Sequence, residues 1–397
     1  VAEGMAAITL YCAPNASEQE MAVRLAEAGC RCLGSWSELG MVRVEVAVAN
    51  LPKVAALPWV LRIEPTSPDP VLVNHSGRTL GRASVLNLPI ALGGRGLLGK
   101  GTRVGIWDAN VVTHPDFGGR VHQQEYELGG SNAEHGTHVA GTVLGAGMLD
   151  PDGRGMAPKA EAYTYNFNKQ SNGKTAQQEM DEAARTFGIT LTQNSYGLPL
   201  GRLCSYYDKL GYFASDYELD RLATLHPTLT HVFAAGNDQD GCEKQVVERW
   251  GTAGYGTVAR RAKNVINVAA LQEDGSMTDF SSWGPQDDGR LFPTVAAKGG
   301  QVYSTKPAGE YQSMDGTSMA CPTVTGHLAL VQERYRQLNR GAHMQSDLLR
   351  AVAANTADDA GRKGPDFQYG FGILNAEKAV IALEKGYYQT GVLKAGE

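Results

Sequence analysis

Polar and apolar residues alternate regularly in the first 65 residues of the chain. Valine alternates with charged residues over positions 42–46, and this period of two predicts a strand with one buried face. Apolar residues recur at helical spacing up to position 28, and Gly29 follows them as a helix stop signal. The predicted order is strand, helix, strand, strand, helix, strand, over residues 7–12, 18–28, 30–36, 42–46, 53–56 and 60–63.

A different pattern begins near residue 100, where short apolar runs alternate with helical patterns. The runs are rich in β-branched and aromatic residues, and between two of them apolar residues line one face of a helix at 176–187. This alternation predicts a mainly parallel sheet, in which functional groups gather at the carboxyl ends of the strands. The predicted strands are residues 103–107, 162–167, 189–195, 230–235 and 264–269.

Residues 65–80 separate the two patterns. They include three prolines and show little periodicity, which predicts an extended, exposed connector. A chain of 397 residues is also long enough for one large and one small domain. We therefore expect a small domain with its connector over residues 1–74 and a large domain over residues 75–397.

Composition narrows the possible partners. The chain has 36 basic and 42 acidic residues, a net charge of −6, and no block of like charges, so neither nucleic acid nor an anionic membrane surface is expected as a partner. No apolar run approaches the length of a membrane span. The six cysteines match no common zinc spacing, so one or two disulfides are possible.

Four polar residues stand where a strand ends or a helix begins. Asp108 follows the strand RVGIW, His135 opens a helix in EHGTHVAGT, Asn237 follows THVFAAG, and Ser318 begins a buried helix in GTSMACP. Alone, each has an ordinary interpretation as a turn, core or helix-capping residue. Together they supply a nucleophile, a general base, a carboxylate that orients the base, and a donor for an oxyanion.

Two other kinds of site were weighed. His135 and His138 could share a helical face as a metal pair, but no third ligand stands in a recognised motif and HExxH is absent. We expect His138 instead to be a buried structural residue. An α/β-hydrolase would need a GxSxG turn, whereas Ser318 lies in GTSMA.

The motifs HGTHVAGT and GTSMACP, joined in order by NSYG, AAGN, FSSWGP and YGFGILNA, resemble those of the subtilisin-like serine proteases, or subtilases. The resemblance runs from about residue 85 to about residue 380. It implies a three-layer α/β fold and a serine endopeptidase that needs no cofactor for its chemistry. Ser318 would attack the peptide carbonyl, His135 would carry the proton, Asp108 would orient His135, and Asn237 would help to bind the oxyanion.

The resemblance also implies how a protein or peptide substrate binds. The substrate would lie as an added strand between residues 194–197 and a second stretch near residues 167–173. Residues 234–236 would form one wall of the primary specificity pocket. The expected substrate-binding residues are Asn194, Ser195, Tyr196, Gly197, Ala234, Ala235 and Gly236.

The chain departs from the family pattern at two places. Ala109 and Asn110 follow Asp108 where the family usually has Ser or Thr and then Gly, which should change the hydrogen bonding around the carboxylate. The loop at residues 145–155 lies where many relatives bind calcium, but it lacks their asparagine-rich ligand pattern. A structural calcium site remains possible, with Asp116, Asp150 and Asp152 as its candidate ligands.

The first domain has the order of a ferredoxin-like α+β fold and resembles the propeptide of subtilases, an intramolecular inhibitor. This implies a secreted proenzyme whose signal peptide is absent from this sequence. A silenced protease that serves as a binding protein is the alternative, and the four intact active-site residues argue against it.

Two processing features are expected from the same resemblance. The chain should cut itself within residues 72–75. A disulfide should join Cys204 and Cys242, which follow two segments that border the cleft, whereas Cys321 should be a small buried hydrophobic residue.

Overall fold

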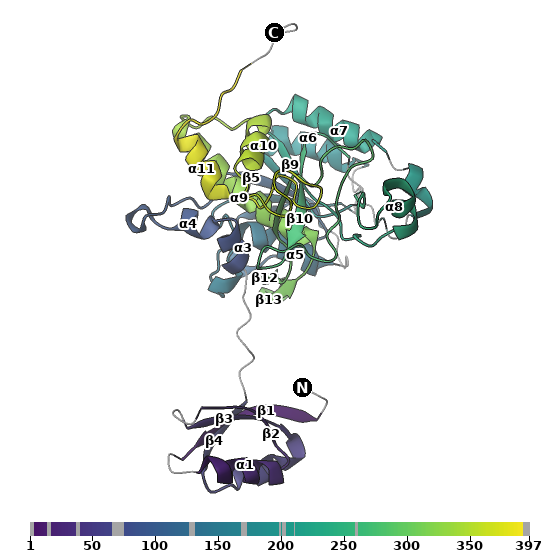
Figure 1. Cartoon of the computed structure of the whole chain (residues 1–397). Coiled ribbons are helices and arrows are strands. Elements are labelled where there is room, and N and C mark those ends of the chain that lie inside the picture. Colours follow the sequence, from purple (N-terminus) through teal and green to yellow (C-terminus); the bar gives the residue numbers. More distant parts are fainter. Residues whose placement is uncertain are drawn as a thin grey trace. The chain divides into compact units, whose positions relative to one another are not determined.

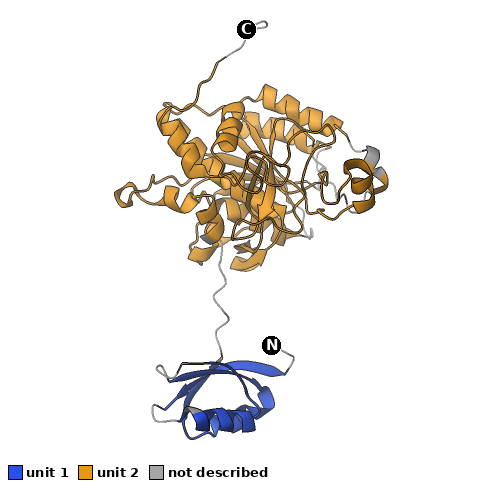
Figure 2. Cartoon of the chain, viewed as in Figure 1, with its two compact units in different colours: residues 1–71 blue, residues 72–397 orange. Residues whose placement is uncertain are grey.

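The computed structural model describes residues 4–13, 17–36, 40–65, 75–126, 132–167, 173–197, 200, 204–209, 211–258 and 261–391. The chain divides into two compact units, unit 1 at residues 1–71 and unit 2 at residues 72–397 (Figure 2). The sequence had placed this boundary after residue 74. Because the positions of the two units relative to one another are not determined, each is described by itself.

Unit 1 is a four-stranded antiparallel sheet with two helices. The strand order is β2-β3-β1-β4, which is the ferredoxin-like arrangement expected from the sequence. The alternating valines of β3 are buried, as the period of two requires. The elements are β1 (Met5–Cys12), α1 (Glu18–Glu27), β2 (Arg31–Trp36), β3 (Met41–Ala47), α2 (Leu51–Ala55) and β4 (Val60–Pro65).

Unit 2 is built on a seven-stranded parallel sheet in the order β11-β10-β9-β8-β5-β7-β6 (Figure 1). A separate antiparallel hairpin, β12 (Val302–Lys306) with β13 (Glu310–Met314), lies outside this sheet. The strands of the main sheet are β5 (Arg103–Asp108), β6 (Val121–Gln123), β7 (Glu161–Asn166), β8 (Leu191–Asn194), β9 (Thr230–Ala234), β10 (Val265–Leu271) and β11 (Val295–Lys298).

Helices cover both faces of this sheet. Side chains along β5 alternate between two cores: Ile106 packs with residues of α5 and α9, and Trp107 packs with residues of α6 and α7. The result is the three-layer α/β fold expected from the sequence. The helices of unit 2 are α3 (His75–Leu80), α4 (Ala83–Asn87), α5 (Ala133–Leu144), α6 (Ala176–Phe187), α7 (Ala214–Leu225), α8 (Glu243–Trp250), α9 (Thr317–Leu338), α10 (Ser346–Asn355) and α11 (Ala376–Glu384).

The expected connector is not extended along its whole length, because residues 75–80 form helix α3. This helix packs against β11, and the Lys298 amine donates a hydrogen bond to the Ser76 hydroxyl. The following turn is held by His327 of α9, whose Nε2 accepts from the Ala83 N–H at 3.2 Å. Helix α3 has six residues, which are too few to show a helical period in the sequence. Its stability depends on these tertiary contacts, so the sequence pattern did not predict it.

No helix within the described ranges is both long and apolar enough to cross a membrane.

Candidate active site

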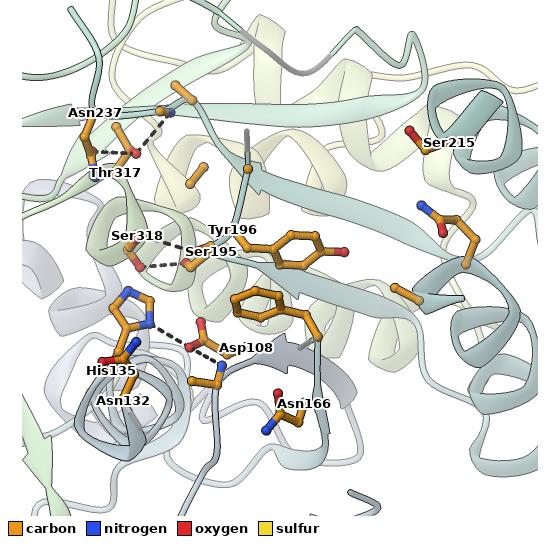
Figure 3. A pocket seen from close by; sticks show the side chains of 18 of the residues that line it. Asp108, Asn132, His135, Asn166, Ser195, Tyr196, Ser215, Asn237, Thr317 and Ser318 are labelled. Carbon is orange, nitrogen blue, oxygen red and sulfur yellow. Dashed lines mark hydrogen bonds and ion pairs between the residues drawn. The ribbon is translucent and has the colours of Figure 1, made fainter. Parts of the chain in front are cut away.

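The four predicted active-site residues come together at the carboxyl edge of the sheet in unit 2. Asp108 is the last residue of β5, Asn237 follows β9, and His135 and Ser318 lie in the first turns of α5 and α9. All four line one cleft of about 800 Å³. In Figure 3 the His135 ring lies next to both Ser318 and the Asp108 carboxylate. Parallel strands end at a common edge, which is why residues so distant in sequence meet here.

Asp108 fixes the orientation of His135. Its Oδ1 lies 2.6 Å from His135 Nδ1, and the carboxylate is fully buried while the imidazole is 27% exposed. Nδ1 therefore carries the proton, and Nε2 is left as the base. Burial lowers the pKa of His135, but the charge of Asp108 and the hydrogen bond raise it by more, so the pKa lies above the ordinary value of 6.5.

A close approach between α5 and the end of β5 makes this contact possible. A Cβ atom on Gly136 would lie 2.6 Å from the carbonyl oxygens of both Ala109 and Asn110, so only glycine fits after His135. Asp108 Oδ1 also accepts from the Ala109 N–H at 2.7 Å. Its other oxygen, Oδ2, is buried and has no donor in the part of the chain that the structure describes. Alanine at position 109 offers no hydroxyl for that oxygen.

The Ser318 hydroxyl points toward the sheet. Ser318 Oγ donates to the Ser195 carbonyl at 3.3 Å, and no hydrogen bond joins it to His135, both residues being among those described. Helix α9 starts abruptly after Gly316, whose φ of 154° favours glycine. A rotation about the Ser318 side-chain bond would turn the hydroxyl toward His135 Nε2.

Two hydrogen-bond donors border the position that an oxyanion would occupy. Asn237 Oδ1 accepts from the Thr317 N–H at 2.8 Å and from the Thr317 hydroxyl at 2.9 Å, which turns Asn237 Nδ2 the other way. Neither Nδ2 nor the Ser318 N–H has an acceptor within the described ranges. A Cβ on Gly316 would lie 3.4 Å from Ser318 N and 3.6 Å from Asn237 Nδ2, so both donors face one space that glycine leaves open.

Most of the predicted substrate-binding residues line the same cleft. Phe167, from the second predicted stretch, also lines it and stacks on Tyr196 with ring centres 4.9 Å apart. Residues 168–172 of that stretch lie outside the described residues. The predicted residues that line the cleft are Ser195, Tyr196, Gly197, Ala234, Ala235 and Gly236.

Asn194 does not line the cleft, although the sequence predicted that it binds substrate. Its side chain is fully buried, and Nδ2 donates to Thr192 Oγ1 at 2.8 Å and to the Val232 carbonyl at 3.0 Å. The Asn194 side chain therefore fastens β8 to β9 beneath the cleft. A motif letter alone does not show on which side of the sheet a side chain lies.

The family of the chain follows from sequence comparison with known proteins. The sequence model of the Subtilase family matches residues 99–372. The chain belongs to the subtilase family. It is a serine endopeptidase, and the match covers every residue of the site described above.

Individual relatives agree with this assignment. The subtilase is 31% identical to subtilisin DY of Bacillus licheniformis over 299 residues, which are 72% of this chain and 93% of the relative. It is 29% identical to subtilisin Savinase of Lederbergia lenta over the same shares of both chains. The solved protease domain of PatA, at 23% identity and a TM-score of 0.53, covers 73% of this chain and 98% of its own length and has the same fold.

The subtilase cleft contains acidic residues that the sequence analysis missed. Glu179 of α6 lines the cleft but is only 7% exposed, and its carboxyl accepts from Trp107 Nε1 at 2.9 Å and hydrogen-bonds the Glu125 carboxyl. Burial raises the pKa of Glu179 to about 7. A glutamate beside the buried Met180 on an amphipathic helix is unusual, and that pattern could have drawn attention to it.

Candidate metal ligands of the subtilase have hydrogen-bond partners within the protein. His138 Nε2 donates to the Val302 carbonyl at 2.8 Å, and burial lowers the pKa of His138 to about 4, so this imidazole is a neutral structural group. Asp116 accepts from the backbone N–H groups of Gly147 and Met148, both at 2.8 Å. Over the described residues, no three His, Cys, Asp or Glu side chains are grouped to hold a metal ion.

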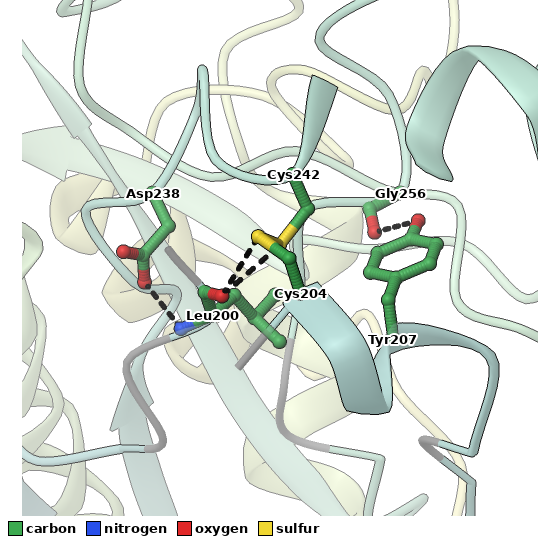
Figure 4. Close-up of a disulfide and its surroundings, with 6 residues drawn as sticks. All are labelled: Leu200, Cys204, Tyr207, Asp238, Cys242 and Gly256. Carbon is green, nitrogen blue, oxygen red and sulfur yellow. Dashed lines mark hydrogen bonds between the residues drawn. A yellow bond between two sulfur atoms is a disulfide. The ribbon is translucent and has the colours of Figure 1, made fainter. Parts of the chain in front are cut away.

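The predicted disulfide between Cys204 and Cys242 is present (Figure 4). It links the segment after Gly197 to the segment after Asn237, and Asp238 Oδ2 in the second segment accepts from the Leu200 N–H of the first at 3.2 Å. Cys321 is fully buried in α9, and burial raises the pKa of its thiol to about 12, as expected for a hydrophobic core residue.

Proposed function

We propose that the enzyme cleaves peptide bonds through an acyl-enzyme on Ser318. His135 Nε2 takes the proton of the Ser318 hydroxyl as Oγ bonds to the substrate carbonyl carbon, and the carbonyl oxygen becomes the oxyanion between Asn237 Nδ2 and the Ser318 N–H. His135 then gives the proton to the leaving amine as the C–N bond breaks. A water molecule, activated by His135 in the same way, releases the acyl group as a carboxylic acid.

One observation carries this proposal. A base whose tautomer is fixed by a buried carboxylate, a serine hydroxyl and two donors without acceptors all border one cleft. Each part has a role in acyl transfer, and separate structural roles would not require all of them to border the same cleft.

A fluorophosphonate probe tests the identity of the nucleophile. The probe should label wild type once, at Ser318, and should not label Ser318→Ala. Ser215 also lines the cleft, so Ser215→Ala is the matched control and should be labelled like wild type. Labelling that persists in Ser318→Ala would refute the mechanism.

We further propose that the enzyme is secreted as a proenzyme and that unit 1 is its inhibitor. The ferredoxin-like topology of unit 1 matches the expectation for a propeptide, and a disulfide at the cleft fits an oxidising compartment. The cut expected within residues 72–75 would fall just before or at the start of α3. After the cut, unit 1 should remain bound as a product-like inhibitor until it is itself degraded.

Incubation of wild type and Ser318→Ala in separate tubes tests self-processing. Wild type should acquire a new N-terminus within residues 73–75, while Ser318→Ala stays intact. Adding a trace of active enzyme to Ser318→Ala then separates cutting within one molecule from cutting between molecules. A chain that is labelled at Ser318 but never cuts itself would contradict self-processing, whereas a chain that is neither labelled nor cut would support the silenced protease that serves as a binding protein.

A further inference from the structure

The carbonyl of Ser318 lacks its normal partner within helix α9. In an α-helix each carbonyl accepts from the N–H four residues later, which for Ser318 is position 322. That position is Pro322, inside the helix, and proline has no N–H. The backbone of the nucleophile would therefore have an unsatisfied acceptor at the point where its position matters most.

The Ser195 side chain supplies the missing donor. Ser195 Oγ donates to the Ser318 carbonyl at 2.8 Å, and Gln193 Nε2 donates to Ser195 Oγ at 2.6 Å. A serine hydroxyl has one proton, so the bond from Gln193 directs that proton toward Ser318. Gln193 is fully buried and Ser195 is 7% exposed, and a bond shielded from water in this way is strengthened.

We propose that Ser195 is a positioning residue for the nucleophile, held in place by Gln193 and made necessary by Pro322. The inference rests on the proposed role of Ser318. It differs from the expected role of Ser195 as part of the substrate-binding strand, because that role uses the backbone and this one uses the hydroxyl.

The hydrogen bond from Ser195 fixes the peptide plane that follows Ser318 in the first turn of α9. Asn237 holds the Thr317 N–H on the side that precedes the nucleophile, and Ser195 holds the Ser318 carbonyl on the side that follows it. With both sides held, the Ser318 N–H and Cβ keep their directions relative to the oxyanion space. Ser195 also belongs to the segment, residues 194–197, beside which substrate is expected to lie, so the same bond sets the distance between nucleophile and bound peptide.

Ser195→Ala should lower kcat for a peptide amide roughly ten- to a hundredfold, with little change in KM, because misplacement of a reacting group costs rate more than binding. Ser195→Thr keeps the hydroxyl and should stay within a few fold of wild type. Thr323→Val is the matched control. It removes a hydroxyl that donates to the next carbonyl, that of Met319 at 2.9 Å, which keeps its own helical N–H donor.

Pro322→Ala provides the decisive test, since it restores an N–H four residues after Ser318. In the Ser195→Ala background it should recover most of the lost kcat, while Pro322→Ala alone should remain near wild type. Folding of every variant is checked by thermal unfolding and by titration of Ser318 with the fluorophosphonate.

Three outcomes would overturn the inference. They are an unchanged kcat in Ser195→Ala, a loss confined to KM, and a folded double variant with no recovery. If Pro322 variants do not fold, equal losses in Ser195→Ala and Ser195→Thr would overturn it instead. Failure of the proposed function would look different, because Ser318→Ala would then keep its activity.

Discussion

The two ends of the cleft are built differently. The catalytic end, made of Asp108, His135, Asn237 and Ser318, stands on strand ends and helix starts. Hydrogen bonds fix the side chains of Asp108, His135 and Asn237, whereas the Ser318 hydroxyl must rotate to reach His135. The aromatic end, made of Phe167, Tyr196 and Glu179, depends on ring stacking and on a buried carboxyl with a shifted pKa. The positions of the catalytic residues therefore depend on the ends of the sheet, whereas the positions of Phe167 and Tyr196 depend on their contact with each other.

The largest effect should come from the catalytic end, with Asn237→Leu. Loss of the Nδ2 donor should lower kcat about 100- to 1,000-fold with little change in KM, the size characteristic of the equivalent donor in subtilisin. Gln177→Leu removes an amide that lines the same cleft near α6 and is the control. It should alter KM rather than kcat. Steady-state kinetics of both variants on the same peptide amide measure the two effects. An equal loss of kcat in Asn237→Leu and Gln177→Leu would contradict a specific role of Asn237.

The pH profile should also report on the catalytic end. His135 must be neutral to accept a proton, and its pKa is raised, so protonation removes activity at a higher pH than for a free imidazole. We expect kcat/KM to rise about tenfold per pH unit below that pKa and then to level off. A profile that falls as the pH rises through neutrality would contradict the role of His135.

A smaller effect is expected at the aromatic end. Burial raises the pKa of Glu179 to about 7, so this carboxyl gains its negative charge as the pH rises through neutrality. Lys174 at the rim is already paired with Glu182. We therefore compare two peptides that differ at one position away from the scissile bond, one with Lys and one with norleucine. The Lys peptide should be cleaved a few fold faster, and this ratio should be larger at pH 8 than at pH 6.

Glu179→Gln should abolish this preference and leave cleavage of the norleucine peptide unchanged. Glu218→Gln, at an exposed glutamate of α7 that does not line the cleft, is the control and should retain the preference. If both variants lose it equally, the acidic field of the whole cleft is responsible rather than Glu179.

Sequence alone predicted the catalytic end because its residues must occur in fixed motifs. Gly136 is required by a close approach to the backbone after Asp108, and Gly316 is required by its backbone angle. Glycine at these motif positions therefore indicates the local geometry. The mainly parallel sheet followed from apolar runs and helical periods, and the three-layer fold followed from the resemblance to subtilases. The ferredoxin-like order of unit 1 followed from strict alternation.

Other features could not be predicted because they depend on tertiary contacts. Helix α3 is too short to show a period, and the buried strand β11 and the hairpin β12–β13 carry no distinctive pattern. Asn194 is among the expected substrate-binding residues, and only the fold shows that its side chain is buried between β8 and β9. The bond from Ser195 to Ser318 joins positions 123 residues apart, and only the fold reveals it.

The burial of helix α9 also affects how the protease is cleaved by other copies of itself. Apart from Ser318, residues 317–333 of this helix are buried, so the segment that carries the nucleophile is closed to a neighbour's cleft unless the core of unit 2 opens. The exposed turn that follows α4, where Ile90 is 78% and Leu92 70% exposed, offers apolar side chains on a surface loop. Self-digestion should begin at such loops, and a nicked molecule can keep a working Ser318 as long as its core stays closed.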